Sequence, residues 1–207
     1  MVSLASDYQR FVRLTNELLQ LNHKLTNLEL EYQKLISENI MLRLFYELDK
    51  CAENIALKLT RGVLYLDGSA PRLLIPGFRS VDAARQHMLQ VTKKYYLEWT
   101  TLSKIQKNLN GILDPGDHFL SIRSLHDATY DDMRHVRNHI AHGSTSTQLK
   151  FSALSTKIFS ASRGINPGRF LLSCKAAIPG NPPKDRIIVQ YIRWSKVFIK
   201  TLTKSPI

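Results

Sequence analysis

The chain has 207 residues, of which 43% are hydrophobic. This suits one domain, or one domain with an extension, and excludes a chain that is disordered throughout, because such chains have too little apolar surface to bury. The net charge is +12, and residues 151–207 carry +9 of it, with ten Lys and Arg against one acid. This asymmetry favours a polyanionic partner such as nucleic acid, although it would also attract an acidic protein.

The cysteines and the apolar runs bear on location. Cys51 and Cys174 are the only cysteines, and they are too few and too far apart for a disulfide framework or a metal-binding motif. The sequence contains no run of about 18 apolar residues, so no membrane span is predicted, and residues 1–10 lack the apolar core of a secretory signal. We therefore expect a cytoplasmic protein with no membrane partner.

The first predicted element is one long helix, or two, over residues 4–61, which contain neither Pro nor Gly. Its apolar residues alternate steps of three and four, a spacing typical of a coiled-coil seam. They are Phe11, Leu14, Leu18, Leu21, Leu25, Leu28, Tyr32 and Leu35, with the pattern continuing through Asn39, Leu42 and Tyr46. Further apolar residues widen the stripe, as in a helix of a globular bundle, so core packing is the preferred interpretation and a dimer arm the alternative.

The middle of the chain predicts shorter elements separated by Gly and Pro. In chain order they are a structured loop over 62–80 with a small hairpin as one option, a helix from Ser80 or Asp82 to Val91, a helix within 97–110 that stops near Gly111, and a turn at 114–117. These assignments follow from capping residues and turn residues rather than from long periodic patterns.

The remainder predicts three more helices and one long loop. They are a helix from Asp127 or Thr129 through Ile140 with Gly143 as its terminating residue, a helix over about 148–160, a basic loop over 161–184, and an amphipathic helix over about 185–202. The expected fold is all-α, with roughly six helices in a bundle. Residues 1–160 are expected to form this bundle, with residues 161–207 packed on the same domain.

Four of the seven histidines fall between residues 126 and 142. His135 and His139 have the spacing of the two zinc ligands in zinc proteases, but Val136 stands where those enzymes need Glu. Arg134 and Arg137 would repel a divalent cation. We therefore expect no metal and no other cofactor at this helix.

The same helix carries groups suited to chemistry on a phosphate. Asn138 and His142 are four residues apart, so they share a face and can hydrogen-bond, and Arg137 can reach the rim of that face. Arg recognises phosphate oxygens, and His carries protons near neutral pH. Attack of an RNA 2′-hydroxyl on its own phosphodiester needs these groups and no metal. The plainer alternative is a basic helix end that interacts with the helix dipole.

The run Arg137-Asn138-x-x-x-His142-Gly143 resembles the signature of the HEPN superfamily. The segments Leu66–Leu74 and Leu113–Phe119 are more specifically similar to the RiboL-PSP-HEPN subgroup. The resemblance implies an up-and-down helical bundle with a long N-terminal helix, here with a basic C-terminal helix. It also implies a homodimer in which two motif helices build one site, and a metal-independent endoribonuclease that leaves a 2′,3′-cyclic phosphate. Such proteins act as toxins of toxin–antitoxin systems or in anti-phage defence, often with a partner protein.

Carried over to this chain, the resemblance assigns a role to each motif residue. Arg137 would stabilise the scissile phosphate, Asn138 would orient the histidine or contact RNA, and His142 would be the general acid or base. A second Arg-x4-His frame is formed by Arg134 and His139, which we expect to contact RNA.

Two other classes of function stay open at the level of sequence. One is a non-catalytic RNA-binding or regulatory module with the same fold. The other is a partner-binding protein that uses the apolar stripe over residues 11–46.

Overall fold

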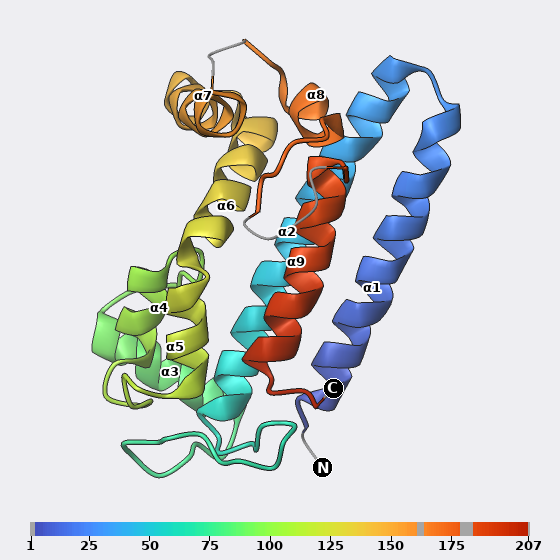
Figure 1. Ribbon diagram of the computed structural model, residues 1–207. Coiled ribbons are helices and arrows are strands. Elements are labelled where there is room, and N and C mark those ends of the chain that lie inside the picture. The colour runs from blue at the N-terminus through green and yellow to red at the C-terminus, as the bar shows by residue number, and fades with distance from the viewer. Residues whose placement is uncertain (1–2, 161–163, 179–183, 207) are drawn as a thin grey trace. The chain divides into compact units, whose positions relative to one another are not determined.

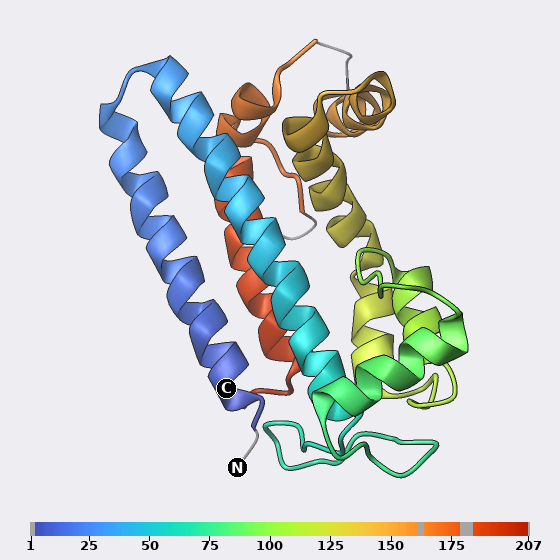
Figure 2. The same ribbon diagram turned by 180° about the vertical axis from the view of Figure 1, so that it is seen from behind.

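The computed structural model describes residues 3–160, 164–178 and 184–206, and this part of the chain is all-helical, with no strand. The predicted all-α bundle is therefore confirmed, with nine α-helices among the described residues where roughly six were expected (Figures 1 and 2). They are α1 (Ala5–Lys24), α2 (Leu30–Leu59), α3 (Val81–Thr92), α4 (Leu102–Leu109), α5 (His118–Leu125), α6 (Asp127–His142), α7 (Thr145–Phe159), α8 (Pro167–Leu172) and α9 (Ile187–Leu202), with a 3-10 turn, η1 (Leu25–Asn27), between α1 and α2. None of these helices combines the length and the apolar character needed to cross a membrane.

The chain forms two compact units, each assembled from separate stretches of sequence. Unit 1 comprises Met1–Phe11, Leu48–Ala128 and Val197–Ile207, and unit 2 comprises Val12–Glu47 and Thr129–Lys196. Four helices, α1, α2, α6 and α9, therefore contribute residues to both units. The expected division at residue 160 stays a prediction.

The apolar stripe of the first helices is not one continuous buried face. Residues 12–24 of α1 and 30–47 of α2 run antiparallel in unit 2 (Figure 1). Leu28, which follows η1, has an extended backbone, so the helical periodicity of α2 does not continue that of α1. Leu14, Leu18 and Leu25 are buried, whereas Leu21 of α1 is exposed, as are Leu28, Tyr32, Leu35 and Tyr46 after η1. The buried side of α2 in this unit is formed by Ser37, Ile40, Met41, Leu44 and Phe45 instead.

In unit 1, capping residues set the helix boundaries. Ser80 caps α3 by accepting a hydrogen bond from Ala83 N at 3.0 Å, as its position in the sequence predicts. The optional hairpin in the 62–80 loop does not form in the described structure, where one isolated antiparallel bridge joins Leu73 to Leu113. Helix α5 is not predicted from sequence, because its cap, Asp117, is also the last residue of the predicted turn over 114–117.

In unit 2, two short elements differ from expectation. Helix α7 begins at Thr145 rather than near residue 148, because Ser144 caps it. Helix α8 lies inside the segment expected to be a loop, where Asn166 accepts a hydrogen bond from Arg169 N and Pro167 occupies the first turn. Gly168 of this helix fits closely against α2, since a Cβ there would lie 2.6 Å from the Cβ of Lys34.

Candidate active site on helix α6

Helix α6 is positioned by an apolar face and a glycine. Tyr130, Met133 and Val136 are buried and follow the i, i+3 spacing of a helix face. Gly143, directly after the last helical residue, has φ +55° and donates its N–H to the carbonyl of His139 at 3.0 Å. The predicted motif residues therefore all lie on this one helix, in unit 2.

Arg137 lies against an aromatic ring. Its guanidinium carbon is 5.1 Å from the centroid of Phe45, a buried residue of α2. The Phe45 ring in turn meets Tyr130 of α6 edge-on, with 5.2 Å between centroids. A cation over a ring face is attracted by the ring quadrupole, so this contact limits where the guanidinium can lie.

Asn138 and His142 share the neighbouring face of α6. Asn138 is half-buried, and His142 is exposed at the last residue of the helix. Within the described residues no hydrogen bond joins the two side chains, so the pairing that their spacing permits is not formed. At about 100° per residue, Arg137 and His142 are separated by about 140° around the helix axis. A single α6 helix therefore presents the guanidinium and the exposed imidazole on different sides.

The Arg134 and His139 side chains have partners within the fold. Nε of Arg134 donates to Oδ1 of Asp131 at 3.0 Å, and Nη2 forms an ion pair with the same oxygen at 2.9 Å. The His139 ring stacks on Phe151 of α7, with 4.9 Å between centroids and 20° between planes, and its Nδ1 lies 3.4 Å from Thr147 Oγ1. The Arg134 contacts lie within α6, and the His139 contacts join α6 to α7. His142, by contrast, is exposed.

Burial distinguishes the other two histidines of the cluster. The pKa of His135 is lowered from its ordinary value by burial and then by the positive charge of Arg134. Its Nδ1 is buried and has no hydrogen-bond partner among the described residues. In unit 1, the pKa of His126 is lowered by burial and by Arg123, and its ring meets Phe198 edge-on. Both environments favour a neutral imidazole.

The acidic residues near the motif are paired with cations. Asp131 pairs with Arg134, and Asp132 accepts a hydrogen bond from Lys157 of α7 at 2.8 Å. Across residues 3–160, 164–178 and 184–206, no group of three or more His, Cys, Asp or Glu side chains is arranged to hold a metal ion.

Comparisons with known proteins do not assign the chain to a family. No protein-family model matches the chain, and neither does any curated protein or solved structure. The sequence placed the motif residues on one helix but could not reveal the rings that hold them. Phe45 and Phe151 are ordinary apolar residues of other helices, and no sequence signal connects them to Arg137 or His139.

Proposed function

We propose that the protein is a metal-independent endoribonuclease of the HEPN type. One observation carries the proposal: α6 ends in an exposed imidazole, His142, and five residues earlier bears a guanidinium, Arg137, that lies on the ring of Phe45. The net charge of +12 supports an RNA substrate, because cations along a phosphate backbone release counterions. The resemblance of Arg137-Asn138-x-x-x-His142 to the family signature supports the reaction type.

The proposed reaction is an in-line transesterification. The ribose 2′-hydroxyl loses its proton to a base, its oxygen attacks the adjacent phosphorus, and the bond from phosphorus to the 5′-oxygen breaks. The leaving 5′-oxygen takes up a proton, so the products are a 2′,3′-cyclic phosphate and a 5′-hydroxyl. His142 serves as the base or the acid, and Arg137 stabilises the charge that develops on the phosphate oxygens. Asn138 orients the imidazole or contacts the RNA.

The proposal includes a homodimer with the site shared between two copies of α6. The separation of about 140° between Arg137 and His142 on one helix supports this arrangement, because a facing helix from a second copy can supply the missing group. A role as a toxin or as an anti-phage effector, with an antitoxin or another defence protein as partner, is supported by the family resemblance alone.

The test is cleavage of a defined RNA in EDTA by the full-length protein, with end-group analysis of the products. Wild type is compared with His142→Ala and with His23→Ala, a matched control that removes another exposed histidine from the last turn of a helix, α1. Cleavage that leaves cyclic-phosphate ends, is abolished in His142→Ala and is retained in His23→Ala supports the proposal. Cleavage by all three proteins alike, or dependence on a metal ion, contradicts it.

A non-catalytic RNA-binding module is the second candidate. The observation that favours it is the lack of a hydrogen bond between Asn138 and His142 within the described residues, which leaves the imidazole unoriented in one copy of the chain. This candidate predicts salt-sensitive RNA binding with intact RNA in every lane.

A further inference from the structure

Two adjacent tyrosines project into solvent between α3 and α4 of unit 1. Tyr95 has a relative exposure of 101% and Tyr96 of 68%. Single exposed apolar residues are common, but two neighbouring aromatic rings without cover represent a large apolar area left in water. Tyr96 also lines a shallow hollow of about 320 Å³, together with Leu89, Leu97 and the ion pair of Glu53 with Arg85.

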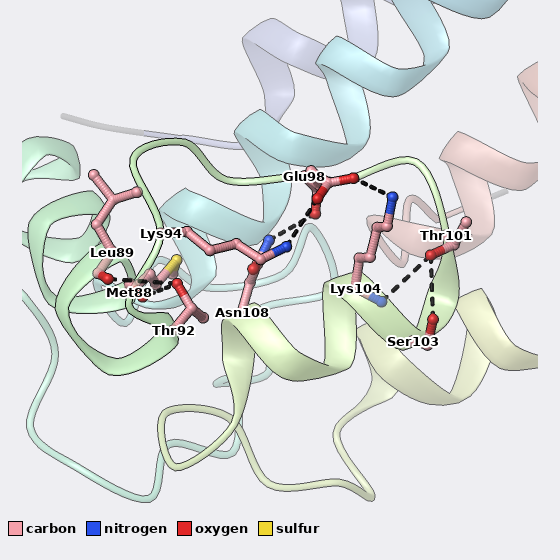
Figure 3. A network of polar contacts seen from close by, with 9 residues as sticks. All are labelled: Met88, Leu89, Thr92, Lys94, Glu98, Thr101, Ser103, Lys104 and Asn108. Carbon is pink, nitrogen blue, oxygen red and sulfur yellow. Dashed lines mark hydrogen bonds and ion pairs between the residues drawn. The ribbon is translucent and has the colours of Figure 1, made fainter.

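The backbone on both sides of these tyrosines is fixed by polar contacts. Lys93, which directly follows α3, has φ +53°, and Lys94 N donates to the carbonyl of Leu89 at 3.2 Å. After the tyrosines, the carboxylate of Glu98 accepts hydrogen bonds from both Lys94 and Lys104 (Figure 3). The two lysines lower the pKa of Glu98 to about 2, so this carboxylate is charged at neutral pH.

Two further contacts complete the anchor. Asn108 Nδ2 donates to the carbonyl of Glu98 at 2.8 Å (Figure 3), and the neighbouring Trp99 is buried. The loop therefore holds its exposed rings on a fixed backbone, which reduces the entropy lost when a ligand binds.

The charge around the tyrosines is positive. Between residues 93 and 110 the only acid is Glu98, whereas the basic residues are Lys93, Lys94, Lys104 and Lys107. Lys93 and Lys107 are exposed. Exposed aromatic rings beside an excess of lysines are the combination that binds single-stranded nucleic acid, because bases stack on the rings and phosphates meet the cations. A protein partner would also use tyrosines, but the lysines favour a polyanion.

We infer that residues 93–107 form a binding site for single-stranded RNA, in which unpaired bases stack on Tyr95 and Tyr96 and Lys93 contacts the backbone. The choice of RNA as the ligand rests on the proposed function. The segment belongs to unit 1 and the motif residues to unit 2. We assign the segment substrate capture rather than bond cleavage, because stacking rings bind bases without acting on the reacting bond.

Binding is measured with the full-length His142→Ala protein, so that no cleavage interferes, and a fluorescently labelled single-stranded RNA of 12 nucleotides. Tyr95→Ala and Tyr96→Ala are each expected to raise Kd about fivefold or more, since loss of one stacking partner has an effect of this order. Tyr95→Phe keeps the ring face and is expected to bind as the parent protein does. Tyr32→Ala, which removes another exposed tyrosine from α2, is the matched control and is expected to leave Kd unchanged.

Two more comparisons sharpen the test. The same strand annealed into a duplex is expected to bind more weakly, because its bases are not free to stack. Lys93→Gln is expected to reduce the slope of log K against the logarithm of the salt concentration by about one, the value for one lost phosphate contact. Lys24→Gln on α1 is expected to leave this slope unchanged. Circular dichroism of each variant establishes that it is folded.

The inference is overturned if the tyrosine variants keep the parent Kd, if Tyr32→Ala weakens binding equally, or if the duplex binds as well as the single strand. These outcomes differ from failure of the proposed nuclease. A wild-type protein that leaves RNA intact, while Tyr95→Ala loses affinity, overturns the nuclease and supports the binding site. Normal cleavage by wild type, with unchanged affinity in the tyrosine variants, supports the nuclease and overturns the binding site.

Discussion

Helix α6 and the segment 93–107 both combine cations with aromatic rings, but in opposite arrangements. At α6 the aromatic rings are buried and pack against polar side chains, with Phe45 against Arg137 and Phe151 against His139. In the 93–107 segment a charged group, Glu98, fixes the backbone, and the rings point outward. The first arrangement restrains Arg137, the guanidinium that we propose counters charge on the phosphate, and the second leaves flat apolar surfaces exposed. We therefore expect changes at α6 to affect kcat and changes at 93–107 to affect substrate affinity.

The largest expected effect is that of His142→Ala on kcat. Removal of a general acid or base is expected to lower kcat for RNA cleavage by about 100-fold or more. The Kd for RNA is expected to stay within about twofold of wild type, because His142 is one exposed group at a helix end. Single-turnover kinetics at saturating protein, together with the binding assay, separate the two quantities. A proportional loss of affinity would place His142 in RNA binding and remove the contrast between the regions.

The next effect separates the two Arg-x4-His frames. Arg137→Gln is expected to lower kcat by about 100-fold, since one charge-stabilising donor has an effect of this order. Arg134→Gln is the matched control, because the Arg134 guanidinium is already paired with Asp131, and it is expected to lower kcat by less than about threefold. Rates are measured in EDTA with the RNA used for His142→Ala. A larger loss in Arg134→Gln would make Arg134 and His139 the working frame.

A smaller effect is expected from the segment 93–107. The double variant Tyr95→Ala, Tyr96→Ala is expected to raise KM about tenfold or more, with kcat unchanged, because stacking binds substrate without acting on the reacting bond. Initial rates over a range of RNA concentrations measure both constants. A fall in kcat at saturating RNA would show that the tyrosines act in the chemical step as well.

How far the fold follows from sequence depends on local signals. The start of α3 at Ser80 and the end of α6 at Gly143 were predicted, because a capping residue and a glycine mark them. Helix α5 was not predicted, because its cap, Asp117, is the last residue of the predicted turn, and α8 was not, because six residues are too few to show an apolar period. Helix α8 also lies among Gly and Pro residues that usually mark loops.

The candidate site was predictable in residue type and in position on one helix, but not in its contacts. Pairing of Arg137 with Phe45 depends on how α2 packs against α6, and no residue spacing encodes it. The exposure of Tyr95 and Tyr96 was also hidden, because aromatic residues are usually buried and the sequence does not mark the exceptions. The catalytic roles of Arg137, Asn138 and His142 stay predictions.

The smallest expected effect is on the pH dependence of folding stability, which differs between the two regions. Burial lowers the pKa of His135 below its ordinary 6.5, so the folded protein binds this proton less tightly than the unfolded chain does. The stability linked to His135 is therefore fully present above pH 6.5 and declines as the pH falls below it. Glu98 has its pKa lowered from 4.5 to about 2, so its stabilising contribution is fully present above pH 4.5 and is lost between 4.5 and 2.

Urea unfolding of wild type, His135→Gln and Glu98→Gln at pH 7.5, 5.5 and 3.5 measures both contributions. Between pH 7.5 and 5.5, His135→Gln is expected to lose less stability than wild type, with a remaining decline from His126, whose pKa is also lowered. Glu98→Gln is expected to follow wild type over this interval at lower stability, and the difference is expected to shrink by pH 3.5. An unchanged pH slope in His135→Gln would mean that its imidazole is hydrated in the folded protein, because a solvated ring keeps its ordinary pKa and contributes nothing to the slope. The α6 region would then lack the buried, neutral histidine that distinguishes it from the charged anchor at Glu98.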